Sequence, residues 1–174
     1  SQPMDFAVGG FDIALRAAPE RMKDSSLVAR KACPIYAKLF ASPKYLEASG
    51  IPRLPDDLAD HRWVTHRGLP TLTLASKSGS ATFKPHGPIR CDDIFFVRQA
   101  VRSGAGIGII PTFLVAKDVA RGRLVAVLPQ YHSVAAFVYI IRPGTREVPR
   151  RVRVFSDFLL EYLATHPLMA SPPT

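Results

Sequence analysis

The sequence predicts an α/β fold, in which strands alternate with helices and the sheets are mostly parallel. Three observations lead to this prediction. Residues 134–141 are apolar throughout, as expected of a strand buried on both faces. The segment after Pro149 carries apolar residues at helical spacing, at positions 152, 155, 158, 159, 162 and 163. The stretch QAVRSGAGIGIIP at 99–111 ends one helix and runs directly into a short strand.

This glycine-rich stretch is the most informative part of the chain. The preceding helix has apolar residues at 94, 97, 100 and 101, and Ser103-Gly104 ends it. Gly104, Gly106 and Gly108 then alternate with small or apolar residues, which lets one backbone segment approach another closely. A dinucleotide-binding loop is the alternative, but such a loop follows a strand and opens a helix. The order here is the reverse, which favours a packing role.

The other elements are predicted from local signals. Ser42 caps a helix that has Pro43 at its first position and ends at Gly50. Asp92 is the expected cap of the helix that precedes the glycine-rich stretch. The remaining predictions are a helix at 3–10, strands at 11–16, 27–30, 36–41, 63–67, 109–110 and 124–128, a helical turn before His61, a hairpin of 72–75 with 81–84, a helix at 112–121 and a loose tail at 167–174.

Composition excludes several classes of protein. The 174 residues, of which 47% are hydrophobic and 21% charged, suffice for one domain or two small lobes. Cys33 and Cys91 form no CxxC pair, so neither a disulfide framework nor a zinc site is expected. The sequence has neither an apolar run long enough to span a bilayer nor a signal-peptide pattern. We therefore expect a cytoplasmic protein without a membrane partner.

The formal net charge of +9 raises the question of nucleic-acid binding. One local basic cluster is present, at arginines 142, 146, 150, 151 and 153. A specific nucleic-acid binder usually adds a docking helix, an aromatic platform or a recognisable module to such a patch, and this sequence shows none. The cluster therefore indicates the solvated start of a helix, with weak nonspecific affinity for phosphates as the alternative.

Enzyme signatures are absent from the sequence. It contains neither a GxSxG nor an HExxH motif, and its five histidines lack the spacing of metal ligands. Ser42, His66 and Asp93 could be assembled into a triad on paper, but triads are recognised by geometry and nothing in their spacing supports one. No catalytic residue, metal or cofactor is predicted.

Six segments carry a resemblance to a known family. They are DFAVGGFDIALR, LVARK, LFASPKYLEASGIPRLPDDLADHRW, AVRSGAGIGIIPTFLV, GRLVAVLP and PRRVRVFSDFLLEYL. In this order they are similar to the effector-binding domain of LysR-type transcriptional regulators, from about Met4 to Leu163. The resemblance implies a fold like that of type II periplasmic binding proteins, with two α/β lobes, two crossover strands and a small effector bound in the cleft.

Laid on this chain, the resemblance places lobe I at residues 1–36 plus 133–170 and lobe II at 37–132, with 171–174 as a tail. The hinges are expected at 36–41 and 133–137. Family members also carry an N-terminal winged helix-turn-helix, a linker helix for dimerisation and an opening strand-helix-strand of lobe I, which this sequence lacks. Lobe I is therefore expected to be incomplete, and DNA binding and assembly into a dimer or tetramer are expected of a longer protein.

Two candidate effector contacts lie in the first part of the chain. Arg16 ends a predicted strand, where a guanidinium could hold a carboxylate with two parallel bonds. The alternative is a surface pairing with Asp12 or Glu20. Ser42 caps its helix in the first place, and a contact with the effector would be additional.

The other candidates lie in the expected lobe II. Thr65, His66 and Arg67 close its first strand, at the loop that contacts effector in the family, and supply a hydroxyl, an imidazole and a cation. A structural role is the alternative for His66. With Asp92 as the cap, the free amides of the following helical turn favour an anion, and Asp93 in the same site partly opposes it.

The sequence thus predicts the effector-sensing domain of a LysR-type regulator, with a small carboxylate or aromatic acid as its ligand. Two alternatives from other classes remain. A free-standing solute-binding protein would be exported, and an enzyme on the same two-lobe scaffold would consume its ligand.

Overall fold

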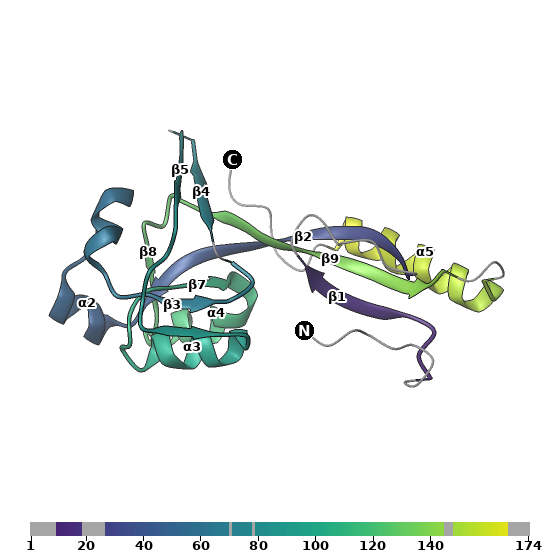
Figure 1. Ribbon diagram of the computed structural model, residues 1–174, viewed down its shortest axis with the longest axis horizontal. Coiled ribbons are helices and arrows are strands. Elements are labelled where there is room, and N and C mark those ends of the chain that lie inside the picture. The colour runs from purple at the N-terminus through teal and green to yellow at the C-terminus, as the bar shows by residue number, and fades with distance from the viewer. Residues whose placement is uncertain (1–9, 19–26, 70, 78, 145–147, 167–174) are drawn as a thin grey trace. The chain divides into compact units, whose positions relative to one another are not determined.

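The computed structural model describes residues 10–18, 27–69, 71–77, 79–144 and 148–166 (Figure 1). In chain order the elements are β1 (Ala14–Ala18), β2 (Leu27–Ala41), α2 (Pro43–Ser49), the 3-10 helix η1 (Pro55–Asp60), β3 (Val64–His66), β4 (Leu72–Ser76), β5 (Gly79–Phe83), β6 (Ile89–Cys91), α3 (Ile94–Arg102), β7 (Gly108–Pro111), α4 (Thr112–Ala120), β8 (Val125–Val127), β9 (Ser133–Pro143) and α5 (Arg150–Thr165).

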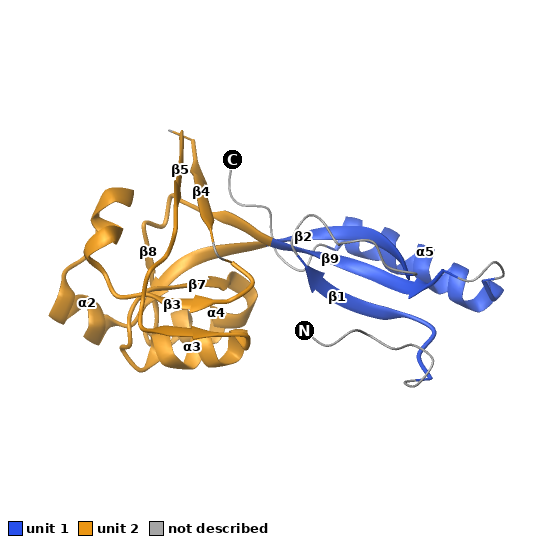
Figure 2. Cartoon of the chain, viewed as in Figure 1, with its two compact units in different colours: residues 1–35, 136–170 blue, residues 36–135, 171–174 orange. Residues whose placement is uncertain are grey.

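The chain forms two compact units, drawn in different colours in Figure 2. Unit 1 comprises Ser1–Ile35 and Ala136–Ala170, and unit 2 comprises Tyr36–Ala135 and Ser171–Thr174. Both boundaries fall inside strands, since β2 and β9 each continue from one unit into the other. The boundaries expected from the family resemblance, 1–36 plus 133–170 and 37–132, lie close to these.

Unit 1 is built on the strand order β1-β9-β2. β1 runs antiparallel to β9, which places Arg16 opposite Tyr139. Residues 138–141 of β9 are buried, whereas Val134 is exposed, so this strand is buried on both faces only over its second half. Helix α5 is tied to β2 by an ion pair between Asp157 and Arg30.

Unit 2 surrounds the second half of β2, which lies between β7 and β8. β3 pairs with β6 in parallel, and it approaches β7 through a bridge between Trp63 and Ile107. The two faces of these strands carry separate cores. Leu39, Trp63 and Ile109 pack in the core on the face of α2 and η1, and Val64 and Ile110 pack with the residues of α3 and α4.

Many locally signalled elements are confirmed. α2 begins at Pro43 with Ser42 as its cap, because the Ser42 hydroxyl accepts a bond from the Tyr45 N–H (3.3 Å), and it ends at Gly50. The hairpin forms from β4 and β5, and α3 leads through the glycines into β7. The turn before His61 is η1.

Other predictions are wrong for identifiable reasons. The sheets are not mostly parallel, because β2 opposes both β7 and β8 in direction and the pairs β1–β9 and β4–β5 are antiparallel. The strands predicted at 27–30 and 36–41 form one continuous strand. The first strand covers 14–18 rather than 11–16, so Arg16 lies in its middle and not at its end.

Helix α5 also differs from its prediction. Val152 and Leu163 of the apolar stripe are buried, but Phe155, Phe158 and Tyr162 are about half exposed in the described structure. The buried face is therefore narrower than the sequence pattern. Most of the predicted helix at 3–10 and the whole tail at 167–174 lie outside the described residues.

The glycine-rich stretch packs as the sequence predicts. The Ile107 N–H donates to the Arg62 carbonyl (2.8 Å), and the Val64 N–H donates to the Ile107 carbonyl (2.9 Å). A Cβ atom on Gly106 would lie only 2.3 Å from the Arg62 carbonyl oxygen. Only glycine fits there without moving β3 away from β7.

A buried carboxylate joins the two helices on the other face. Asp118 of α4 is fully buried and accepts from Arg98 of α3 (Nε to Oδ2, 2.7 Å). Arg123 lies 2.8 Å from its second oxygen, and the Asp118 carbonyl accepts from the Arg123 N–H (2.8 Å). Removing one member of a buried ion pair leaves the other charges uncompensated, so this cluster fixes α3 against α4.

Gly106→Ala should lower the melting temperature because the new methyl group collides with a backbone oxygen. We expect a loss of about 3 kcal/mol in the free energy of unfolding, at the upper end for overpacking. Gly79→Ala is the matched control, since Gly79 also has a positive φ (141° against 157°) but open space around it. Equal losses in the two variants, measured by denaturant unfolding, would show that the close approach is not what requires glycine.

Asp118→Asn should destabilise unit 2 by about 2 kcal/mol, because a buried carboxylate loses its charge-assisted bonds to arginines that are themselves about a third exposed. Asp92→Asn is the control. Asp92 forms an exposed ion pair with Arg67 in the same unit (3.6 Å), and such pairs contribute about 1 kcal/mol or less. Denaturation curves that rank the two variants in the opposite order would contradict this view of Asp118.

Candidate functional site

Strand β3 sends the predicted site residues to two different faces. Successive residues of a strand point to opposite sides, so Thr65 shares a face with Trp63 whereas His66 shares one with Val64. The register of β3 with β6 places Thr65 beside Arg90 and His66 beside Cys91. Two distinct environments therefore arise from adjacent residues.

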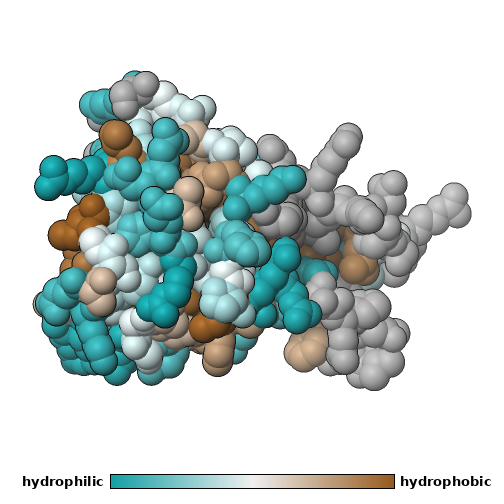
Figure 3. Space-filling model, turned by 60° about the vertical axis from the view of Figure 1, so that its left-hand side comes forward, coloured by the Kyte–Doolittle hydropathy of each residue, from teal (hydrophilic) through white to brown (hydrophobic). Residues whose placement is uncertain are grey.

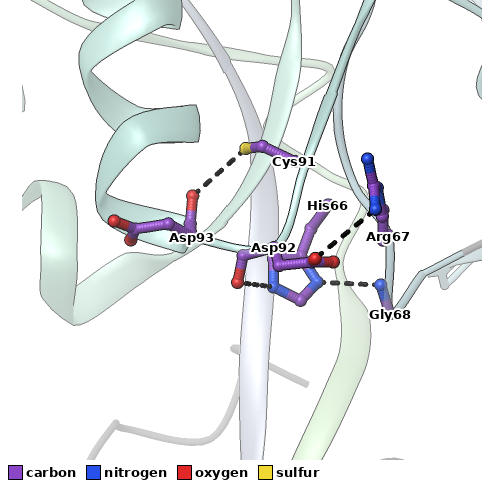
Figure 4. Close-up of polar contacts among 6 residues, drawn as sticks. All are labelled: His66, Arg67, Gly68, Cys91, Asp92 and Asp93. Atoms are coloured by element: carbon purple, nitrogen blue, oxygen red, sulfur yellow. Dashed lines mark hydrogen bonds and ion pairs between the residues drawn. The ribbon is translucent and has the colours of Figure 1, made fainter. Parts of the chain in front are cut away.

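On the α3 side, His66 is held by backbone groups at both ring nitrogens (Figure 4). The Gly68 N–H donates to Nδ1 (3.0 Å), which makes Nδ1 an acceptor. Nε2 then carries the proton and donates it to the Asp92 carbonyl (2.9 Å). His66 thus joins the end of β3 to the start of α3, in line with the structural alternative raised by the sequence.

Asp93, and not Asp92, is the cap of α3. Its Oδ1 accepts from the Phe95 N–H (2.8 Å), while the Asp92 side chain extends toward Arg67 (3.6 Å) (Figure 4). The prediction of Asp92 as cap is wrong by one residue, because the Asp92 carbonyl and carboxylate are engaged by His66 and Arg67. With Asp93 on the helix start, a carboxylate already occupies the place where an anionic ligand was expected.

On the opposite face, Thr65 lines a cavity of about 420 Å³, which we call the Thr65 cavity. It lies wholly within unit 2 and is lined by Thr65, Leu69, Thr71, Lys84, Pro85 and Arg90. Thr65 is buried, and its hydroxyl donates to the Ile89 carbonyl (3.3 Å), which fixes its orientation.

Two cations in this cavity are available to a ligand. Within the described part of the chain, the side chains of Lys84 and Arg90 form neither an ion pair nor a hydrogen bond, and no carboxylate lines the cavity. A guanidinium can hold a carboxylate with two parallel bonds, an ammonium adds a point charge, and hydroxyls add neutral hydrogen bonds. The cavity is thus suited to a small organic acid.

Ser42 lies apart from this cavity within unit 2. Ser42 is beside Gly104, where an added Cβ would lie 3.5 Å from its hydroxyl, near the beginning of β7. His66 is level with the end of β7. It is therefore roughly four residues further along the strands than Ser42, which corresponds to about 13 Å. Arg16 belongs to unit 1, where its strand pairs with β9. The structure therefore does not gather all the predicted residues at one point.

Sequence reasoning missed Thr71, Lys84 and Arg90. Arg90 meets Thr65 only through the parallel register of β3 with β6, over a separation of 25 residues. No local pattern marks Arg90, because its neighbour on β3 is set by the pairing of the two strands. In the described part of the chain, no group of three potential metal ligands is present, and no helix has the length and apolar character needed to cross a bilayer.

Comparison with known proteins finds similarity to transcriptional regulators. The chain is 36% identical over 161 residues to the HTH-type transcriptional regulator PtxR of Pseudomonas aeruginosa, covering 90% of this chain and 50% of that protein. The regulatory domain of AphB in Vibrio vulnificus matches with a TM-score of 0.69 and 30% identity, over 88% of this chain and 76% of that chain. The full-length Vibrio cholerae virulence activator AphB matches with a TM-score of 0.71 and 28% identity, over 92% of this chain and 55% of that chain.

The chain spans about half the length of the curated relatives it matches. Its likeness to solved regulatory domains confirms the expected α/β fold of the type II periplasmic-binding-protein kind. A model of the LysR substrate binding domain matches residues 2–164, and the chain belongs to this family.

Proposed function

We propose that this chain is the effector-sensing part of a LysR-type transcriptional regulator and that its effector is a small carboxylic acid, with aromatic acids included. The observation that carries the proposal is the Thr65 cavity, in which Lys84 and Arg90 face a ligand space without a carboxylate among its lining residues. The relatives, which are named transcriptional regulators, support a regulator over the solute-binding and enzyme alternatives.

In the proposed complex, Arg90 forms a bidentate bond with the carboxylate and Lys84 adds a second charge. The hydroxyl groups of Thr65 and Thr71 supply hydrogen bonds that fix its orientation. Leu69 and Pro85 offer apolar surface to the rest of the molecule. This division between a few polar groups and apolar walls is typical of small-molecule sites.

The other residues predicted from the sequence have different roles in the proposal. His66 and Arg67 hold the end of β3 against the start of α3 through Asp92 and so set the position of Thr65, while Asp93 caps α3. Direct contacts of Ser42 and Arg16 with the effector remain predictions. In a longer protein, effector binding would control DNA binding through a winged helix-turn-helix, and that protein would act as a dimer or tetramer.

Arg90→Ala should weaken binding of benzoate, the simplest aromatic acid, by about 1.5–3 kcal/mol, because a charge-assisted hydrogen bond is lost. This loss corresponds to roughly a 10- to 100-fold rise in the dissociation constant. Isothermal titration calorimetry of both proteins measures it. Arg121→Ala, which removes an exposed arginine at the end of α4, should leave binding unchanged.

Two further results test the proposal. Benzamide, which has the ring of benzoate without its charge, should bind at least tenfold more weakly. Benzoate recovered after long incubation should be chemically unchanged. Equal affinity of wild type and Arg90→Ala would remove the Thr65 cavity from effector binding, and consumption of benzoate would favour the enzyme alternative.

A further inference from the structure

A second cavity, of about 430 Å³, lies on the same face of β3. We call it the Trp63 cavity, after the buried residue that precedes Thr65 on that face. All of its lining residues belong to unit 2, and they include Asp56, Leu58 and Ala59 of η1 together with Phe83 and Lys84. Its volume falls in the range of small-molecule sites.

The wall of this cavity is aromatic and held in place. The rings of Trp63 and Phe83 lie 5.3 Å apart at an angle of 52°. The Trp63 indole N–H donates to the Leu58 carbonyl (3.1 Å), so this polar group is already satisfied. Trp63 is only 3% exposed, so the ring surface that a ligand can reach is mainly that of the half-buried Phe83, where another aromatic ring gains from offset or edge contacts beyond the burial of its area.

Two opposite charges lie at the same cavity. Asp56 and Lys84 are both exposed, and within the described residues neither side chain forms an ion pair, with the other or with any third group. A ligand with one ammonium and one carboxylate group would complement both. A simple acid or a simple amine would complement only one of them.

Both segments that carry these charges are fixed by backbone contacts. Asp57 accepts hydrogen bonds from the N–H groups of Leu54 (2.9 Å) and Arg53 (2.8 Å), which lower the pKa of its carboxyl and hold the start of η1. Gly87 lies against β3 so closely that a Cβ there would be 2.1 Å from the Trp63 carbonyl oxygen. The Trp63 cavity is therefore largely preformed, which reduces the ordering cost of binding.

We propose that the Trp63 cavity binds an aromatic α-amino acid, at a site that shares only Lys84 with the Thr65 cavity. The ring packs on Phe83 where it lies against Trp63, the carboxylate pairs with Lys84, and the ammonium pairs with Asp56. On the face drawn in Figure 3, hydrophobic side chains form separate patches among hydrophilic ones. Such a surface suits small contacts better than a broad apolar interface.

Trp63 is the only tryptophan of the chain and thus reports on this cavity directly. Titration with 4-iodo-L-phenylalanine should quench its fluorescence in a saturable manner, because the bound iodine would lie beside Phe83, whose ring is 5.3 Å from that of Trp63. Ala59→Phe, which fills the cavity from an exposed position, should raise the apparent dissociation constant at least tenfold. Ala48→Phe, at an exposed position of α2, is the matched control and should leave it unchanged.

The charges are tested with two analogues, 3-(4-iodophenyl)propanoate without the amino group and 2-(4-iodophenyl)ethylamine without the carboxylate. Each should bind at least tenfold more weakly than the amino acid. If either binds as well, the assignment of an amino acid is overturned. Linear, collisional quenching that is equal in wild type and Ala59→Phe overturns the site itself.

Asp56→Asn provides a second variant in case Ala59→Phe fails to fold, since Asp56 is exposed. Unchanged affinity of Asp56→Asn for 4-iodo-L-phenylalanine would contradict the proposal, and a tenfold loss would support it. Benzoate calorimetry on Ala59→Phe separates the two sites. Retained benzoate binding with lost quenching assigns the two ligands to different cavities, whereas loss of both in a folded variant overturns their separation.

Discussion

The close backbone contact between β3 and β7 is the constraint on which unit 2 depends. Gly106 lets the chain pass the Arg62 carbonyl, and the hydrogen bonds of Ile107 then fix the level of β3 relative to β7. Since β7 also pairs with β2, this contact connects β3 and β6 to the long strand that enters from unit 1. A wider spacing would shift Trp63 and Thr65 together, and both cavities with them.

Successive side chains of β3 point to opposite faces, and the two faces have different surroundings. On one face, Val64 packs with α3 and His66 binds backbone groups at the helix start, so this face holds β3 against α3. On the other face, Trp63 and Thr65 line two cavities. Lys84 lines both of them, so a single cation is shared by the proposed acid site and the proposed amino-acid site.

The elements that the sequence predicts correctly are those whose signals are local. Ser42-Pro43 and Gly50 define α2 whatever surrounds it, and the glycine pattern indicates a close approach without naming its partner. The other features depend on contacts between residues that are far apart in the sequence. The cap of α3 moves from Asp92 to Asp93 because His66, 26 residues away, engages the Asp92 carbonyl. Lys84 and Arg90 join Thr65 only through strand register, which no local pattern encodes.

The most direct test of the central claim, that unit 2 holds the acid-binding site, is an NMR titration of the ¹⁵N-labelled chain with benzoate. We expect saturable shift changes centred on the amides of Thr65, Thr71, Lys84 and Arg90, with one common dissociation constant. Smaller changes should extend to Gly68 and Asp92 through His66. Saturable changes that leave these four amides unaffected would place the acid elsewhere and exclude the Thr65 cavity as its binding site.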